Sequence, residues 1–213
     1  MKNKLQSDKY LMIADHYRKC IDQHGDSHLG VDWPKVEDVN KRYQVMLEIL
    51  QKDRSPNIAL LDFGCGTSHL YEYMQQHGYG HLRYAGLDIL DKSVEVAKKK
   101  YPKNAYYCLD ILNTTSDLPM FDYIVMNGVF TQKAGLSSEE MFSFLKRLLS
   151  KIFLSANKGT AFNVMSKQVD WEKEGNFHLG LDIISEYITK ELSQNFVIRH
   201  DYGLHEYTVY VYK

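Results

Sequence analysis

Apolar residues follow two different rhythms along this chain of 213 residues. Up to about residue 52 they recur every three or four positions, which predicts helices over residues 8–21 and 34–52. From residue 58 onward, short apolar runs alternate with segments of helical periodicity. Such runs are typical of strands buried on both faces, so the alternation predicts a parallel sheet covered by helices.

The predicted elements can be placed along the chain. Strands are expected over residues 58–64, 82–88, 105–110, 121–128 and 159–166, and helices over residues 69–78, 91–101, 137–153 and 181–192. Asp91 is expected to cap the second of these helices, and Ser137 or Ser138 the third. Only three residues separate the last two strands, 195–202 and 206–213, and a connection that short joins antiparallel neighbours. The sheet is therefore expected to be parallel except for a C-terminal antiparallel hairpin.

Charge and hydropathy narrow the classes of function. The chain carries 26 basic and 27 acidic residues, a formal net charge of −1, whereas nucleic-acid-binding proteins usually present a net basic face. No apolar run approaches the roughly 20 residues that span a bilayer, and the first residues lack the apolar core of a signal peptide. We therefore expect neither a nucleic-acid partner nor a membrane partner.

The cysteines and histidines do not indicate a disulfide framework or a metal centre. Three widely spaced cysteines are present: Cys20, Cys65 and Cys108. An odd number without close pairs is typical of reduced thiols, so the cytoplasm is the expected location. His24 and His28 are four residues apart, but the glycine and aspartate between them disfavour the helix that a zinc pair would need. No metal is expected.

Four short segments follow the predicted strands at the points where these end. Gly64 and Gly66 come after the first strand and open a helix, as in loops whose backbone approaches a nucleotide closely. Asp88 ends the second strand, where an acid can accept hydrogen bonds from both hydroxyls of a ribose, although it could also cap the next helix. Asp110 ends the third strand, where its carboxylate can meet an adenine amino group. Asn127–Gly128 end the fourth.

Because the carboxyl ends of parallel strands meet at one edge of a sheet, these segments are expected to share one ligand that contains a nucleoside. A dinucleotide is disfavoured, since His69 stands at the third glycine of that loop pattern and no second mononucleotide half follows. The phosphate-loop pattern is also absent from the sequence.

The segments LLDFGCGTSHL, GLDI, YCLDI and FDYIVMNGVF, with the terminal hairpin, resemble the class I S-adenosylmethionine-dependent methyltransferases over about residues 58–166. The resemblance implies a Rossmann-like sheet of seven strands, S-adenosylmethionine as the cofactor and S-adenosylhomocysteine as the product. The cofactor residues that it implies are Asp62, Gly64, Gly66, Asp88, Ile89, Asp110, Ile111, Asn127, Gly128 and Val129. Ser68 stands where the family pattern has its third glycine, and because serine is small we expect altered packing rather than loss of binding.

The acceptor is expected to be a small molecule. The segment 127–130 lacks the Asn/Asp-Pro-Pro-aromatic pattern of enzymes that methylate amines of nucleobases or glutamine side chains. Candidates for the acceptor side are Tyr17, Trp33, Trp171, His178, His205 and Glu206. If the nucleophile arrives protonated, a base is useful, and His205 and then His178 are the candidates. Arg42 could pair with the cofactor carboxylate, and Trp33 could contact the cofactor.

We therefore predict an α/β protein with an N-terminal helical lid over residues 1–54 and a methyltransferase core over residues 55–213. Two alternatives stay open: a methyltransferase that acts on protein or RNA through a partner subunit, and a module that binds the cofactor without turnover. A dinucleotide oxidoreductase is a more distant alternative. The sequence does not indicate the oligomeric state or the methylated atom.

Overall fold

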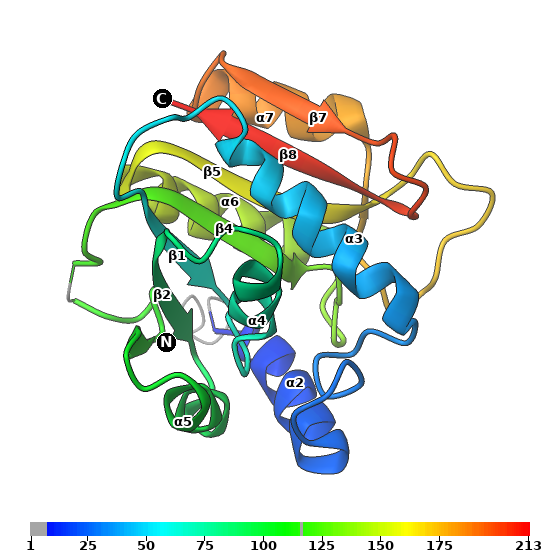
Figure 1. Cartoon of the computed structure of the whole chain (residues 1–213). Coiled ribbons are helices and arrows are strands. Elements are labelled where there is room, and N and C mark those ends of the chain that lie inside the picture. Colours follow the sequence, from blue (N-terminus) through cyan, green and yellow to red (C-terminus); the bar gives the residue numbers. More distant parts are fainter. Residues whose placement is uncertain (1–7, 116) are drawn as a thin grey trace.

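A computed structural model of the chain describes residues 8–115 and 117–213, and one sheet of eight strands runs through it (Figure 1). The strands are β1 (Ala59–Phe63), β2 (Arg83–Asp88), β3 (Ala105–Cys108), β4 (Phe121–Phe130), β5 (Ala156–Ser166), β6 (His178–Leu179), β7 (Phe196–Arg199) and β8 (Glu206–Tyr212). Their order is β3-β2-β1-β4-β5-β8-β7, with β6 paired to β5. The first five strands pair in parallel, whereas β8 is antiparallel to both β5 and β7. The predicted mostly parallel sheet with an antiparallel hairpin is confirmed, and the two-residue β6 is an unpredicted addition.

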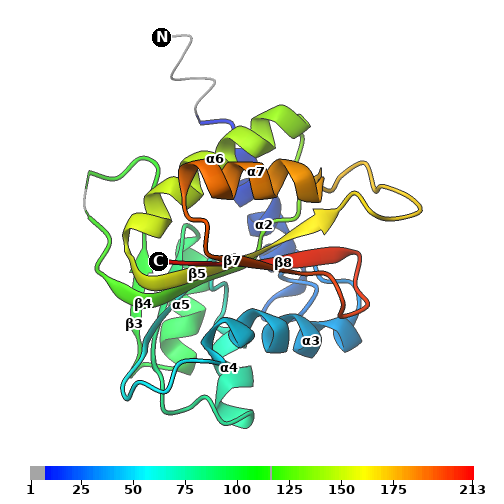
Figure 2. The same cartoon turned by 90° about the horizontal axis from the view of Figure 1, so that it is seen from above.

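The helices form two layers around this sheet. They are α2 (Leu11–His24), α3 (Val36–Leu47), the short 3-10 helix η1 (Glu48–Leu50), α4 (His69–Gln76), α5 (Asp91–Lys100), α6 (Ser138–Leu154) and α7 (Leu181–Glu191). Figure 2 shows α6 and α7 over one face and α3, α4 and α5 over the other. Strand β4 serves both layers because successive side chains alternate: Ile124 and Met126 pack in the core with α6, and Tyr123 and Val125 in the core with α3 and α4. In the part of the chain that the structure describes, no helix is both long and apolar enough to cross a bilayer.

The predicted helix starts are right at α6 and wrong at α5. Ser137 caps α6 in a capping box, because its hydroxyl accepts from the Glu140 N–H and the Glu140 carboxylate accepts from the Ser137 N–H. Asp91, in contrast, is the first residue of α5, and Leu90 occupies the cap position. The Asp91 carboxylate accepts from the adjacent Lys92 N–H at 2.8 Å, and its charge favours the N-terminus of the helix.

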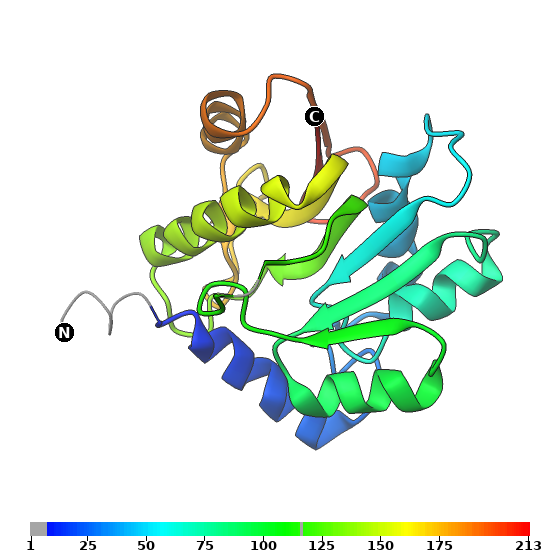
Figure 3. The same cartoon turned by 90° about the vertical axis from the view of Figure 1, so that its left-hand side faces the viewer.

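Helix α2 lies beside the carboxyl ends of the central strands, on the side toward which their arrowheads point in Figure 3. Helix α3 differs, because its buried residues Tyr43, Met46 and Leu47 pack with Leu60 of β1 in the core of one sheet face. Of the lid predicted over residues 1–54, α2 and the segment up to Trp33 reach the carboxyl edge of the sheet, together with Tyr43 from α3. Residues 1–7 of that prediction lie outside the described residues.

Candidate functional site

One pocket at the carboxyl edge of the sheet brings the predicted cofactor residues together. Its walls come from the segments that end β1, β2, β3 and β4, and α2 with the segment up to Trp33 covers it. The predicted residues that line it are Asp62, Gly64, Gly66, Asp88, Ile89, Asp110, Ile111, Asn127, Gly128, Val129 and Trp33. The strand order explains this meeting, since neighbouring parallel strands present their carboxyl ends at the same edge.

The loop after β1 comes close to the opposite wall because it has glycine at two points. Gly64 has a φ of 75°, and a Cβ at this position would lie 2.8 Å from Cγ2 of Val129. Its N–H and that of Cys65 both donate to the Leu87 carbonyl, at 2.7 and 3.0 Å. Gly66 has a φ of 51°. A larger residue at position 64 would therefore be strained and would also displace the wall.

Ser68 shows why the family pattern has a third glycine. It adopts a φ of 68° at the start of α4, a left-handed conformation that glycine adopts without strain. The residue is fully buried, and its hydroxyl donates to the Tyr106 hydroxyl at 3.0 Å and lies 3.3 Å from the Tyr84 hydroxyl. These contacts hold the loop in shape with serine in place of glycine.

Asp88 supports the glycine loop and keeps acceptor capacity toward the pocket. Its Oδ2 accepts from the Gly66 N–H and its Oδ1 from the Leu90 N–H, both at 2.8 Å. Burial raises the pKa of Asp88, and the backbone hydrogen bonds oppose this shift. A carboxylate has about four lone-pair sites, so acceptor positions remain for the hydroxyls of a ribose.

Strand β1 ends in a second buried acid. Asp62 is 3% exposed, and its Oδ2 accepts a hydrogen bond of 2.8 Å from the Tyr84 hydroxyl. The pKa of Asp62 is raised to about 7, because burial and, to a smaller extent, the charge of Asp88 raise it more than the hydrogen bond from Tyr84 lowers it. Two buried carboxyl groups in one pocket favour a ligand with positive charge, because a cation would stabilise both in their ionised form.

Asp110 is held from two sides. Its Oδ2 accepts from the Tyr10 hydroxyl at 2.7 Å and from the Asn113 amide at 2.9 Å, and its Oδ1 accepts from the Leu112 N–H at 3.0 Å. One lone pair of Oδ1 therefore remains for an exocyclic amine. Ile111, which is buried beside it, provides an apolar wall for a flat ring.

The polar side chain of Asn127 is buried without a hydrogen-bond partner among the described residues. Both its Oδ1 and its Nδ2 are buried, and neither makes a hydrogen bond with any described residue. Buried polar groups are nearly always paired, and an unpaired one costs about 1–3 kcal/mol. Because Asn127 lines the pocket, a ligand that offers both a donor and an acceptor would satisfy it. The amino-acid end of S-adenosylmethionine has this chemistry.

The end of β4 is fixed by three contacts to Gly128, whose φ is 83°. Its N–H donates to Oδ1 of Asn163 at 2.7 Å, and its carbonyl accepts from the hydroxyls of Tyr17 and Thr131 at 3.1 and 2.9 Å. Tyr17 belongs to α2 and was expected on the acceptor side, and it lines the pocket. The cover is thus tied to the end of β4.

The N-terminal helices were predicted to form a lid, but most of the individual residues of the cover that line the pocket were not predicted. Tyr10 and the α2 residues Ile13, Ala14, Tyr17 and Ile21 line the pocket, and only Tyr17 among them had been expected there. Their spacing of three and four residues is the available signal, because it places them on one face of a helix. That spacing indicates a buried face but does not say which surface it meets.

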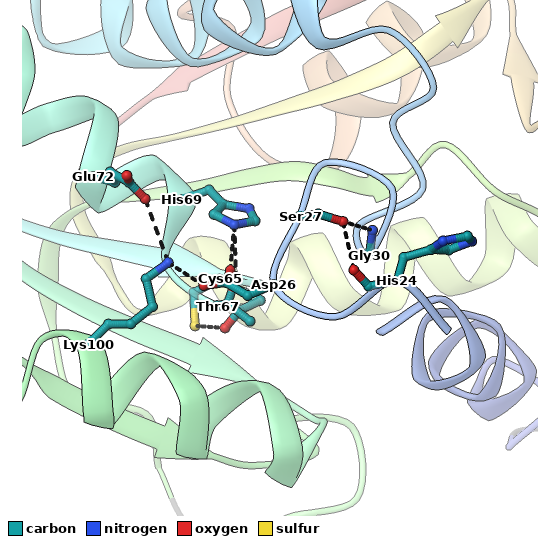
Figure 4. Close-up of polar contacts among 10 residues, drawn as sticks. His24, Asp26, Ser27, Gly30, Cys65, Thr67, His69, Glu72 and Lys100 are labelled. Carbon is teal, nitrogen blue, oxygen red and sulfur yellow. Dashed lines mark hydrogen bonds and ion pairs between the residues drawn. The ribbon is translucent and has the colours of Figure 1, made fainter. Parts of the chain in front are cut away.

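A polar cluster fastens the segment after α2 to the glycine loop (Figure 4). Oδ1 of Asp26 accepts from the Thr67 hydroxyl at 2.5 Å and lies 2.6 Å from Nε2 of His69. Its Oδ2 pairs at 2.8 Å with the ammonium of Lys100 on α5, which also lies 3.6 Å from Glu72. Burial alone would raise the pKa of Asp26, but hydrogen bonds from Lys100 and Thr67 and the charge of His69 hold it below its ordinary value. An ionised Asp26 therefore connects the cover to α4 and α5.

Arg42 is paired with Glu206 instead of being presented to the pocket. Its Nε lies 3.1 and 3.0 Å from the two carboxylate oxygens of Glu206, and the side chains are only 14% and 2% exposed. Glu206 also accepts from the Asn163 amide at 2.9 Å. The guanidinium of Arg42 lies 5.2 Å from the centre of the Trp33 ring, which borders Gly128. Neither Arg42 nor Glu206 is among the described residues that line the pocket. Arg42 instead contacts the Trp33 ring, and Glu206 contacts Asn163, which binds the Gly128 N–H at the end of β4.

The two histidines expected as bases also lie elsewhere, since neither is among the described lining residues. His178 is buried in β6, where its Nδ1 lies 2.6 Å from the Ser166 carbonyl and its Nε2 accepts from the Lys173 N–H at 3.2 Å. His205 is exposed in the turn before β8, and its ring packs on Trp171 with 5.5 Å between the ring centres. The geometry therefore gives neither histidine access to a ligand in the pocket.

Comparison with known proteins points to the same chemistry. The family described as Methyltransferase domain matches residues 61–151, the stretch from β1 into α6. Rv1506c of Mycobacterium tuberculosis, a curated protein described as a methyltransferase candidate, is 23% identical over 157 residues. The match covers 71% of this chain and 91% of that protein.

Solved methyltransferases share the fold. Magnesium protoporphyrin IX methyltransferase (ChlM) from Synechocystis PCC 6803, with bound S-adenosylhomocysteine, has a TM-score of 0.63 at 12% identity, covering 100% of both chains. The N-methyltransferase NodS from Bradyrhizobium japonicum WM9, in complex with S-adenosylhomocysteine, has a TM-score of 0.63 at 13% identity, covering 93% of this chain and 97% of its own. At these identities the likeness is one of fold.

Proposed function

We propose that this chain, which belongs to the class I S-adenosylmethionine-dependent methyltransferases, transfers the methyl group of S-adenosylmethionine to a small-molecule acceptor. The observation that carries the proposal is one covered pocket that combines two buried acids, Asp62 and Asp88, with the unpaired amide of Asn127. A nucleoside whose amino-acid end carries an ammonium and a carboxylate offers hydroxyls, a positively charged group and partners for the Asn127 amide at the same time.

Each part of the pocket would then hold a different part of the cofactor. Asp88 binds the ribose hydroxyls, and Asp110 with Ile111 binds the adenine. Asp62 and Asn127 hold the amino-acid end beside the glycine loop. When bound, the cofactor supplies a sulfonium methyl that is already activated for displacement. The chain's own task is to align the acceptor with that methyl group and to exclude water.

The walls near the end of β4 favour a small acceptor with apolar or aromatic character. Tyr17, Trp33 and Val129 line this part of the pocket, and none of them carries a charge. The cover formed by α2 admits a small molecule more readily than a folded protein or a duplex. One similar structure is named for its small-molecule acceptor, magnesium protoporphyrin IX, which fits the same class.

The proposed cover consists of residues 10–33, a shorter segment than the lid expected over residues 1–54. Within it, Tyr17 has the one hydroxyl that reaches the end of β4 from α2. Burial raises the pKa of Tyr17, so this hydroxyl acts as a hydrogen-bond donor and not as a base. We therefore assign the role of general base to neither His178 nor His205. The cytoplasmic location is still a prediction.

Calorimetry on the full chain tests the ligand. S-adenosylmethionine and S-adenosylhomocysteine should bind and NAD should not; binding of NAD alone would overturn the proposal. Asp88→Ala should weaken S-adenosylhomocysteine binding by about 10- to 100-fold, because hydrogen bonds to a charged group contribute about 1.5–3 kcal/mol. Asp91→Ala, which removes an exposed acid at the start of α5, is the matched control and should leave the affinity unchanged.

Transfer of a labelled methyl group tests the acceptor class. The protein is incubated with methyl-labelled S-adenosylmethionine and separately with the metabolite, protein and RNA fractions of a cell extract. Label in the metabolite fraction supports the proposal. Label only in protein or RNA would replace the small acceptor by a macromolecule, and no label in any fraction would favour a binding module without turnover.

A further inference from the structure

A cluster of three side chains lies on the cover, outside the groups assigned to the cofactor. His16 and Cys20 are one turn apart on α2, and Asp32 belongs to the segment that leads into α3. Nε2 of His16 lies 2.9 Å from Oδ2 of Asp32 and 3.7 Å from Sγ of Cys20. All three ligand atoms lie within 4.8 Å of one another. Residues four apart on a helix share one face, so α2 presents both of its donors to the same point.

These separations are close to those around a tetrahedral zinc ion. With Zn–N and Zn–O bonds of about 2.0 Å and a Zn–S bond of about 2.3 Å, tetrahedral geometry places N and O about 3.3 Å apart and N and S about 3.5 Å apart. The observed distances of 2.9 and 3.7 Å differ from these values by about 0.4 and about 0.2 Å. An ion can therefore enter the cluster with side-chain shifts of a few tenths of an ångström.

The donor set selects the kind of ion. One thiolate, one imidazole and one carboxylate suit zinc, whereas Ca²⁺ and Mg²⁺ require several oxygen ligands. A simple ion pair would account for His16 and Asp32, but it would not account for a thiol directed at the same ring nitrogen. The His16 and Asp32 side chains are 35% and 32% exposed, so a water molecule can complete the coordination.

We propose that His16, Cys20 and Asp32 bind one Zn²⁺ ion, which ties α2 to the segment before α3 and thereby stiffens the cover. The neighbours of these ligands face the pocket. Tyr17 follows His16 and donates to the Gly128 carbonyl, and Trp33 follows Asp32 and lines the pocket. The ion needs no cofactor in order to bind, so this inference can fail or hold independently of the proposed function.

The test is zinc binding by the full chain after metal has been removed with a chelator. Titration with Zn²⁺ against a chromophoric zinc indicator should give one ion per chain. Cys20→Ser and Asp32→Asn should each weaken binding by about a hundredfold or more. Cys108→Ser and His24→Gln change exposed residues of the same types outside the cluster and should leave binding unchanged. Circular dichroism checks that every variant is folded.

Two spectroscopic measurements complete the test. Co²⁺ in place of Zn²⁺ should give the visible bands of a tetrahedral site and a thiolate charge-transfer band that is absent from Cys20→Ser. In a Trp171→Phe background, Trp33 is the single tryptophan, and its emission should change on addition of Zn²⁺. The proposed site would be overturned if the number of Zn²⁺ ions bound per chain did not depend on Cys20. It would also be overturned if the Co²⁺ spectrum lacked the thiolate band. Zinc binding without a change in Trp33 emission would overturn its role in the cover.

Discussion

The hydroxyl of Tyr10 donates a hydrogen bond of 2.7 Å to the carboxylate of Asp110. Tyr10 immediately precedes α2 and Asp110 follows β3, so this bond joins the start of the cover to the proposed adenine side of the pocket. The Tyr10 ring is buried and stacks on Phe144, with 5.3 Å between the ring centres. The cover therefore meets the core here through a polar contact in apolar surroundings.

Tyr10→Phe removes this hydrogen bond and keeps the stacked ring. We expect the affinity for S-adenosylhomocysteine to fall about fivefold, because one hydrogen bond contributes about 1 kcal/mol and this one orients Asp110. Calorimetry measures the change. Tyr187→Phe is the matched control, since its hydroxyl donates to the Lys146 carbonyl between α7 and α6, away from the pocket. An equal loss of affinity in both variants would contradict a specific role for Tyr10.

Asp62→Asn is expected to stabilise the protein without ligand. Burial raises the pKa of Asp62 to about 7, whereas an aspartate in the unfolded chain has a pKa of about 3.9. The folded state binds this proton more tightly, so ionisation of Asp62 destabilises the fold above about pH 7, and the penalty disappears as the pH falls toward about 4. Asparagine cannot ionise and can still accept from the Tyr84 hydroxyl. In urea unfolding at about pH 8 the variant should be more stable by about 2–4 kcal/mol, with no gain near pH 4.

The same substitution should weaken cofactor binding and remove its pH dependence. The ammonium group of the amino-acid end needs the ionised Asp62 carboxylate, so the wild-type affinity for S-adenosylhomocysteine should fall about tenfold per pH unit below about pH 7. Asp62→Asn should bind weakly at every pH. Asp53→Asn is a suitable control, because hydrogen bonds from Lys158 and Ser55 keep the pKa of Asp53 low, and it lies outside the described pocket lining. A wild-type affinity that stays flat between about pH 5 and about pH 8 would remove Asp62 from the site.

Asp26→Asn should release the cofactor faster. The Asp26 carboxylate joins the cover to Thr67, His69 and Lys100, and asparagine loses the charge in these contacts. Stopped-flow displacement should show release of S-adenosylhomocysteine accelerated by about 3- to 10-fold, in line with the loss of about 1 kcal/mol of charge-assisted hydrogen bonding. Asp22→Asn is the matched control: Asp22 also pairs with a lysine of α5, but both side chains are more than half exposed. Such an exposed ion pair contributes little to the stability of the cover. Equal acceleration of release in both variants would therefore argue against a specific role of Asp26 in fastening the cover.

The strand-end residues could be predicted from the sequence because a parallel sheet leaves them little freedom. Gly64, Asp88 and Asp110 follow consecutive strands of the same direction, and they line one pocket. The alternation of strands and helices sets that direction, and it can be recognised within windows of about ten residues. Short local patterns, repeated at each strand, are therefore sufficient to predict this part of the candidate site.

The contacts of the cover could not be predicted, since they join residues that are far apart in the sequence. Tyr10 and Asp110 are 100 positions apart, and Arg42 and Glu206 are 164 apart. An amphipathic helix signals a buried face, but its partner surface depends on packing of the whole domain. His178 was expected at the site for its chemistry, and a two-residue strand buries it against β5 instead. Pairing that short leaves no periodic signal in the sequence.

The ion pair between Arg42 and Glu206 is expected to contribute to the stability of the fold and only weakly to ligand binding. Arg42→Met leaves the buried Glu206 carboxylate without its cation, so urea unfolding should show a loss of about 3–5 kcal/mol. The double variant Arg42→Met with Glu206→Gln leaves no charge in this place and should recover most of that loss. Because Arg42 acts through Trp33, the double variant should bind S-adenosylhomocysteine within about threefold of the wild type. A loss of about a hundredfold for S-adenosylhomocysteine but none for adenosine, which lacks the amino-acid end, would instead place Arg42 on the cofactor carboxylate.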